Sequence, residues 1–142
     1  MVIKTQIQGL ENIRNKLNLM SNNLKDLTPF WQLVGSYVQK QTVNERFNKE
    51  QSPSGEKWKP LKHPSKKKGK RKILTDTGTL RRSINFKANH DSAVVGSNLK
   101  YAAVHQFGGR KKNIPARPFL GVNASEMKHI SQMLSLYIKN HV

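Results

Sequence analysis

The chain concentrates its positive charge in one continuous stretch, and most of that stretch cannot lie in a hydrophobic core. The 142 residues carry a formal net charge of +18. Between Lys57 and Arg117 there are seventeen Lys and Arg residues against only Asp76 and Asp91, a balance of +15. Charged side chains are rarely buried unless they are paired. We therefore expect residues 57–117 to present a positive surface to a negative partner, while the two flanks resemble ordinary scaffold.

The densest part of this stretch, residues 56–72, shows neither helical nor strand periodicity. Nine cations occupy Lys57–Lys72, and even in an extended chain their mean spacing of about 5–6 Å is below the screening length of about 8–10 Å. These cations must therefore repel one another in the free protein. We predict a mobile basic loop over residues 56–72 that becomes ordered only against a negative surface.

Before this loop, apolar periodicity predicts one strand and two helices. Alternating polar and apolar residues indicate a short half-buried strand over residues 3–7. Apolar residues three and four positions apart indicate an amphipathic helix over residues 10–27. A second helix is expected to begin at Thr28, as a side-chain cap, with Pro29 behind it, and to continue to about Phe47.

After the loop, short elements alternate with turn-forming residues. Asp76 or Thr77 can cap a single helical turn that ends at Arg82. Residues 84–96 alternate on both sides of an Asn-His-Asp-Ser turn, which predicts a β-hairpin.

The remaining segments predict two helices with an extended segment between them. Ser97 or Asn98 can cap a short helix over residues 101–107. Two prolines then favour an edge strand or a structured loop over residues 114–120. Asn123 and Glu126, three positions apart, form a capping-box pattern that opens a last helix.

These elements predict an α+β fold. We expect residues 1–142 to form a single domain, in which a small antiparallel sheet packs with two N-terminal helices and one C-terminal helix and the long basic loop is inserted. No apolar run approaches the roughly 20 residues needed to span a bilayer, and the N-terminus lacks a signal-peptide pattern. We therefore expect a soluble protein.

Catalytic and metal-binding patterns are weak. The chain has no cysteine, its five histidines lack metal-ligand spacing, and its eight acidic residues are scattered. The sharpest enzymatic pattern is Asp76-Thr77-Gly78, which matches the signature of aspartic proteases. That chemistry needs two carboxylates sharing one proton, whereas Arg81 and Arg82 would keep Asp76 ionised. A capping role for Asp76 is favoured, and we expect neither catalysis nor a cofactor.

The basic stretch fits contact with a phosphate backbone or with an acidic protein surface. Phosphate contacts from Lys and Arg give affinity that depends on salt and ignores base sequence. Only Trp58 offers an aromatic ring within the densest part, and no helix-turn-helix or ribonucleoprotein motif is present. A soluble, sequence-independent nucleic-acid-binding module therefore remains one candidate. The residues expected to contact DNA or an acidic partner are Lys66, Lys67, Lys68, Lys70, Arg71, Lys72, Lys111 and Lys112.

Four segments of the chain form a recognisable series and cover about half of it directly. The segments are Phe47…Gln51-Ser-Pro-Ser-Gly55-Glu-Lys-Trp58-Lys-Pro-Leu61, Ile73-Leu-Thr-Asp-Thr-Gly-Thr-Leu-Arg-Arg-Ser-Ile84, Ala93-Val-Val-Gly96…Tyr101-Ala-Ala-Val-His-Gln-Phe-Gly-Gly109 and Ile114-Pro-Ala-Arg-Pro-Phe-Leu-Gly121. In this order they resemble the virion-morphogenesis or tail-completion proteins of contractile-tailed phages and Mu-like prophages.

This resemblance implies a structural protein that finishes the head-proximal end of the tail or neck so that heads can join. It further implies a ring-forming oligomer, other tail or connector proteins as partners, and a place in the virion after assembly in the host cytoplasm. The motif glycines Gly55, Gly78 and Gly108 are interpreted as turn formers, and Trp58 and Phe107 as anchors. The candidate subunit contacts are Arg81, Arg82, Trp58, His105 and Phe107.

Overall fold

A three-stranded antiparallel sheet forms one layer of the molecule. The computed structural model describes residues 2–5, 26–61, 73–75 and 77–141. Strand β3 (Ala93–Gly96) is central, between β1 (Val2–Thr5) and β2 (Asn85–Ala88). The β2–β3 hairpin is confirmed, and so is the part of the predicted first strand that is described. The hairpin turn is held by the side chain of Asn89, whose Oδ1 accepts the backbone N–H groups of Asp91 and Ser92 at 3.0 and 2.8 Å.

Helix α2 (Thr28–Gln41) continues directly into a π-helical segment, η2 (Thr42–Phe47), so the predicted helical extent to Phe47 is confirmed. The predicted cap is wrong by one residue, because Thr28 is the first helical residue and the N-cap position is Leu27. Just before it, the Asp26 carboxylate accepts the Thr28 N–H at 3.0 Å and the Thr28 hydroxyl. These hydrogen bonds stabilise the ionised carboxylate and lower the pKa of Asp26.

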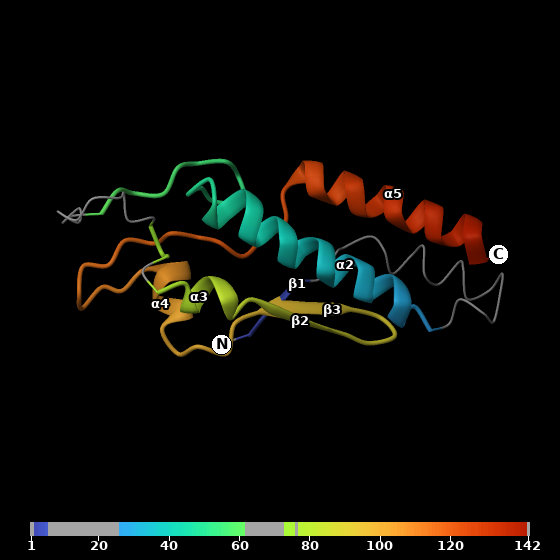
Figure 1. The fold of residues 1–142 in the computed structure, drawn as a ribbon, viewed down its shortest axis with the longest axis horizontal. Coiled ribbons are helices and arrows are strands. Elements are labelled where there is room, and N and C mark those ends of the chain that lie inside the picture. The colour runs from blue at the N-terminus through green and yellow to red at the C-terminus, as the bar shows by residue number, and fades with distance from the viewer. Residues whose placement is uncertain (1, 6–25, 62–72, 76, 142) are drawn as a thin grey trace.

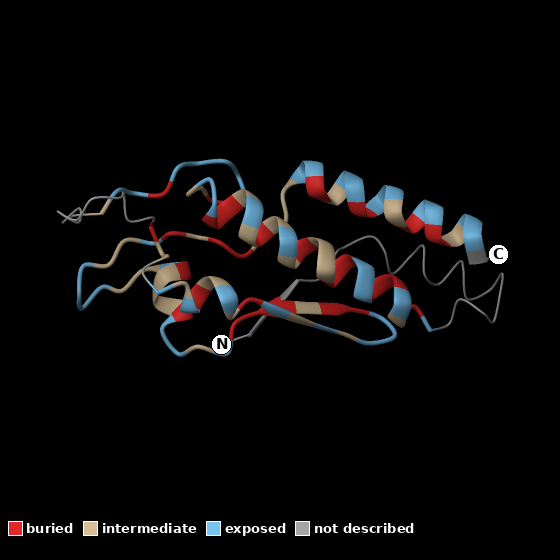
Figure 2. Cartoon of the chain, in the orientation of Figure 1, coloured by how far each residue is buried: buried red, intermediate tan, exposed pale blue. Residues whose placement is uncertain are grey.

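The helices and the sheet stack as three layers, with α2 in the middle (Figure 1). On one side α2 lies across the sheet so closely that a Cβ added at Gly35 would come within 2.4 Å of the Phe86 ring. On the other side lies α5 (Ala124–His141), where Tyr137 packs against Phe30 with ring centroids 5.8 Å apart. Figure 2 shows buried residues along α2 and an exposed outer face on α5. One hydrophobic core therefore fills both interfaces, between α2 and the sheet and between α2 and α5.

A capping box and a buried ion pair fix the start of α5. The Glu126 N–H donates to Asn123 Oδ1 at 2.8 Å and the Asn123 N–H donates to Glu126 Oε1 at 3.0 Å, which confirms the predicted box. The same carboxylate also accepts two hydrogen bonds from Arg46, one of 2.6 Å from Nη1 to Oε2. Arg46 is 1% exposed and Glu126 4% exposed. The pair therefore joins η2 to α5 inside the molecule.

Two short helices differ from the prediction in their caps. Helix α3 (Thr79–Arg82) is preceded by Gly78 with φ of 76°, a left-handed conformation that favours glycine. The Thr77 hydroxyl accepts the Thr79 N–H at 3.4 Å, and Asp76 lies outside the described residues. Helix α4 (Ala102–Phe107) has Tyr101 as its N-cap, because Ser97 instead accepts the N–H of Leu99.

The segment 114–120 is a structured loop, and the edge-strand alternative is wrong. Only Ile114 pairs in a bridge, with Gly109. The rest is held by the buried side chain of Gln106, whose Oε1 accepts the N–H groups of Phe119 and Leu120 at 3.0 Å each. A side-chain amide thus replaces the neighbouring strand that the extended chain would otherwise need.

The α+β class is confirmed. The predicted helix over 10–27 lies outside the described residues except at its end, where Asp26 and Leu27 are not helical. Within the described part of the chain, none of the helices has both the length and the apolar character needed to cross a membrane. The single-domain prediction for 1–142 also covers residues that are not described.

Candidate functional site

The two described ends of the basic loop are tied to one residue, Glu50. Its backbone oxygen accepts the N–H of Trp58 at 2.9 Å, and its side-chain Oε1 accepts the N–H of Ile73 at 2.8 Å. Glu50 has a left-handed backbone (φ 54°), an uncommon conformation for a residue other than glycine. The chain therefore leaves the scaffold and returns to it at nearly the same place.

Trp58 anchors the departing chain in the core. Its indole Nε1–H donates to the Pro118 oxygen at 2.8 Å, and its ring meets Phe47 edge-on with centroids 5.6 Å apart. The anchor interpretation of Trp58 is confirmed. Trp58 is only 5% exposed, so it presents little surface of its own, and its role in a subunit contact stays a prediction.

Arg117 belongs to the structural frame of the site although the sequence groups it with the surface cations. It is 6% exposed, and its guanidinium donates to the backbone oxygens of Lys59 and Pro60 at 2.9 and 3.1 Å. Its own N–H donates to the His105 oxygen at 2.7 Å. Burial lowers the pKa of Arg117. Burial, and secondarily the positive charge of Arg117, lower the pKa of His105.

Beyond α4, a tight loop exposes a cluster of cations. Gly109 and Ile114 exchange two backbone hydrogen bonds of 2.9 Å, which close the loop at its base. At its tip Arg110, Lys111 and Lys112 are all exposed. Lys57 and Lys59 are exposed on the segment 56–61, which runs at the same end of the molecule as this loop (Figure 1). We call these five residues the basic end.

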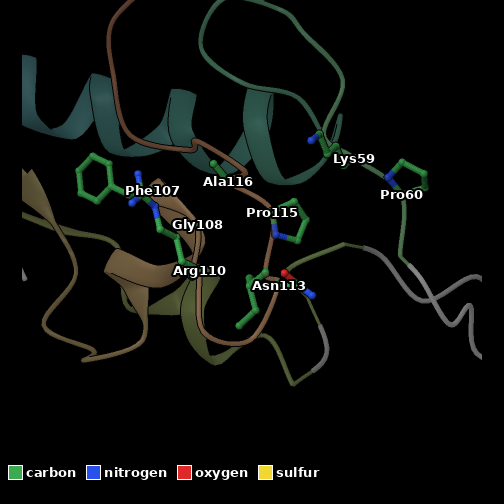
Figure 3. Close-up of a pocket in the computed structure, with 10 residues that line it drawn as sticks. Lys59, Pro60, Phe107, Gly108, Arg110, Asn113, Pro115 and Ala116 are labelled. Atoms are coloured by element: carbon green, nitrogen blue, oxygen red, sulfur yellow. The ribbon is translucent and has the colours of Figure 1, made fainter.

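A groove runs between this loop and the segment at Lys59 and Pro60 (Figure 3). Its volume is about 680 Å³. Phe107, in the lining of this groove, is 67% exposed, so it does not anchor the chain in the core as Trp58 does. The groove is lined by Lys59, Pro60, Phe107, Gly108, Gly109, Arg110, Asn113, Ile114, Pro115 and Ala116, with no carboxylate among them.

The structure describes some of the predicted contact residues and not others. Lys111 and Lys112 are exposed at the basic end, and the other six predicted contact cations, Lys66, Lys67, Lys68, Lys70, Arg71 and Lys72, lie outside the described residues. Arg82 is exposed and folds back over Gly78, while Arg81 and His105 are half-buried. Their roles in subunit contacts stay predictions.

No group of three His, Asp or Glu residues in the described part of the chain gathers in a way that could hold a metal ion. Thr77 and Gly78 of the protease-like motif lead into helix α3.

Sequence reasoning missed four polar residues that shape the site: the buried Arg46, Gln106 and Arg117, and the half-buried Glu50. One signal was available for Arg46. It lies four residues after Thr42, on the helical face that already carries Val34 and Val38, and all four residues are buried. A cation on an apolar stripe needs a partner inside the molecule.

The sequence profile described as the phage virion morphogenesis family matches residues 8–139. The chain belongs to this family. No solved structure matches it.

The chain is also similar to several curated proteins. Mu-like prophage FluMu G protein 2 of Haemophilus influenzae is 30% identical over 143 residues, which is 97% of each chain. FluMu G protein 1 of the same organism is 30% identical over 105 residues, 69% of this chain and 70% of that protein. The provisionally named capsid assembly protein G of Escherichia phage Mu is 41% identical over 64 residues, 41% of each chain.

The four segments that resemble the virion morphogenesis family pack against one another. Phe47 in the first contacts Phe119 in the fourth, with ring centroids 5.5 Å apart. Glu50 in the first holds Ile73 in the second, as described above. The Ser83 and Ser97 hydroxyls join the second and third segments at 2.6 Å. The shared motifs thus build the scaffold from which the basic end projects.

Proposed function

We propose that this member of the virion morphogenesis family is a structural protein that completes the head-proximal end of the phage tail or neck and lets heads join. The observation that supports this role best is a cluster of exposed cations on a family scaffold. The five exposed cations of the basic end lie on the segment 57–59 and on the loop 110–112, and Glu50 fixes both described ends of the basic loop. Such a surface attracts negative partners over about a screening length.

We infer that the protein works as a homo-oligomeric ring with other tail or connector proteins as neighbours. In a ring, each subunit would contribute one basic end, so weak single contacts would add up through multivalency. A positive collar of this kind fits either the DNA that passes through the neck or an acidic neighbouring ring. The role requires contacts alone, so no reaction and no cofactor are assigned, and the protein would reside in the virion after assembly in the host cytoplasm.

A second candidate is a non-enzymatic module that binds nucleic acid without sequence preference. The same basic end supports it, because phosphate contacts from exposed Lys and Arg need no base readout. Light scattering with size-exclusion chromatography separates the two. Self-assembly, or stable assembly with purified tail or connector proteins, supports the structural role. A stable monomer that binds duplex DNA tightly, with an affinity falling steeply in salt, supports the module.

The basic loop provides the direct test of the charge argument. Replacing Lys66, Lys67, Lys68, Lys70, Arg71 and Lys72 with Ser should leave the melting temperature unchanged and reduce the yield of joined particles in a complementation assay. The control replaces Lys40, Lys128 and Lys139, which are exposed on helices α2 and α5, with Ser and should complement fully. A collapse of the melting temperature in the loop variant would contradict the loop interpretation.

A further inference from the structure

We propose that the groove between Lys59–Pro60 and the loop 107–116 docks an acidic, apolar-bearing segment of a different protein. This inference deepens the assembly role proposed above. It rests on that role in one respect, namely that the partner is a neighbouring protein in the phage particle.

The walls of the groove are already fixed before any partner binds. The Arg117 guanidinium ties one wall to the loop through the Lys59 and Pro60 oxygens. The loop itself is closed by the Gly109–Ile114 pair. At Gly108 a Cβ would lie 3.1 Å from both the Ile114 oxygen and the Ala116 nitrogen, so the chain passes there without free space. A preformed site loses less ordering entropy when it binds.

The groove offers two kinds of contact side by side. Apolar groups come from Pro60, Ile114 and Pro115, and Phe107, which also lines the groove, has an exposed ring. Positive charge comes from Lys59 and Arg110 in the lining, followed by Lys111 and Lys112 along the loop. Interfaces between proteins are enriched in aromatic residues and Arg, and a few such residues carry most of the binding energy.

Duplex DNA fits this combination less well than a protein segment does. The duplex backbone presents phosphates to the cations but no apolar group that would bury Phe107 and Ile114. An extended protein segment places alternate side chains on one face about 6.5–7 Å apart. It can therefore bring a carboxylate to Arg110 and an apolar side chain to Phe107 at once.

A second copy of this chain is also a poor occupant. Each copy has a net charge of +18, so a second copy offers little negative charge to match the cations of the groove. In the described part of the chain, the exposed carboxylates are those of Asp26, Glu56 and Asp91. They are separated along the sequence, and Asp26 is already bound to Thr28. Charge complementarity favours a partner with a net negative segment.

The binding test uses a short synthetic peptide of alternating acidic residues and leucines, titrated into the labelled full-length protein and followed by nuclear magnetic resonance. We expect saturable shifts at the amides of Gly108, Gly109 and Ala116. Phe107→Ser should weaken this binding about tenfold, and its melting temperature should stay unchanged because the ring is exposed. Lys111→Ser with Lys112→Ser should also weaken it, whereas the matched pair Lys128→Ser with Lys139→Ser on α5 should not.

Three further probes separate the occupants: the peptide with serines in place of leucines, the peptide with amides in place of carboxylates, and a short DNA duplex. Both altered peptides should bind more weakly than the original. Two results would overturn the proposal. One is the absence of amide shifts in the groove when the acidic–leucine peptide is added. The other is that Phe107→Ser weakens binding of the DNA duplex as much as it weakens binding of the peptide.

A complementation assay keeps this proposal distinct from the assembly role. If particles lacking the protein remain unjoined and Phe107→Ser restores joining fully, the groove is refuted and the assembly role stands. If particles join without the protein, the assembly role fails whatever the peptide does. We expect no joining without the protein and reduced joining with Phe107→Ser.

Discussion

The buried pair between Arg46 and Glu126 provides the sharpest test of how the scaffold is held together. Both side chains are almost fully buried, and the Glu126 carboxylate also accepts the N–H of Asn123 at the start of α5. Replacing Glu126 with Ala would leave the Arg46 guanidinium buried with only two backbone oxygens, those of Gly121 and Gln41, at 3.1 and 3.5 Å. Breaking a buried pair in this way costs about 3–5 kcal/mol.

The loss of the capping box adds about 1 kcal/mol to this figure. We therefore expect Glu126→Ala to lower the free energy of unfolding by about 4–6 kcal/mol, a large share of the 5–15 kcal/mol typical of a domain. Urea denaturation measures the change, with an unchanged m-value showing that the transition stays two-state.

The double variant Arg46→Met with Glu126→Leu is the matched control. It removes both charges and fills the space with apolar side chains, a change that is often neutral or stabilising. We expect it to be more stable than Glu126→Ala by at least about 2 kcal/mol, and a double-mutant cycle isolates the coupling. A loss below about 1 kcal/mol for Glu126→Ala, or a double variant worse than either single one, would refute the reasoning.

Three smaller predictions concern other contacts. Gly35→Ala should destabilise the protein by about 1–3 kcal/mol in urea denaturation, because its Cβ would collide with the Phe86 ring despite the better helix propensity of alanine. Glu50→Ala should speed amide hydrogen exchange at Ile73, which loses its hydrogen-bond acceptor. His105 has a lowered pKa in the folded protein, so the unfolded chain binds the proton more readily; the melting temperature should therefore fall as the pH drops below about 6.5.

Each of these predictions has a control within the chain. For Gly35→Ala the control is Gln32→Ala, at an exposed position of α2, which should be neutral or slightly stabilising. If both variants lost the same free energy of unfolding, the collision with Phe86 would not be the cause. Glu50→Gln retains an oxygen acceptor and should restore slow exchange, whereas Trp58 should be unaffected in either variant because its N–H donates to the backbone. In His105→Gln the pH dependence should be shallower than in the wild type, and an unchanged slope would contradict the assignment to this histidine.

The elements that sequence predicts well are those that depend on local chemistry. The hairpin turn at Asn89 and the capping box at Asn123 involve partners within three residues. Positive φ at Gly55, Gly78 and Gly108 follows in the same way, because these turns favour glycine.

The elements that sequence does not predict depend on partners far along the chain. Arg46 pairs with a carboxylate 80 residues away, and Arg117 donates to backbone oxygens 57 and 58 residues away. Such distant partners decide whether a cation lies on the surface or is buried and hydrogen-bonded inside the protein. Composition does not reveal these partners. Sequence analysis did not predict the groove at Phe107 for the same reason, because one of its walls is held by the hydrogen bond from Arg117 to the Lys59 oxygen.

The family resemblance located the site better than the charge pattern alone did. The motif around Trp58 was interpreted as an anchor, and it is one. Charge density indicated the stretch from Lys57 to Arg117 as a whole, but its members separate into buried and exposed residues in the fold. Burial in the fold therefore distinguishes the cations of the scaffold from those of the basic end.

Electron microscopy of particles made without this protein tests the central claim most directly. A phage or prophage with the coding sequence deleted should yield DNA-filled heads beside separate tails, and supplying the wild-type protein should restore joined particles. Normal joined particles in the absence of the protein would contradict the proposed role at the junction of head and tail.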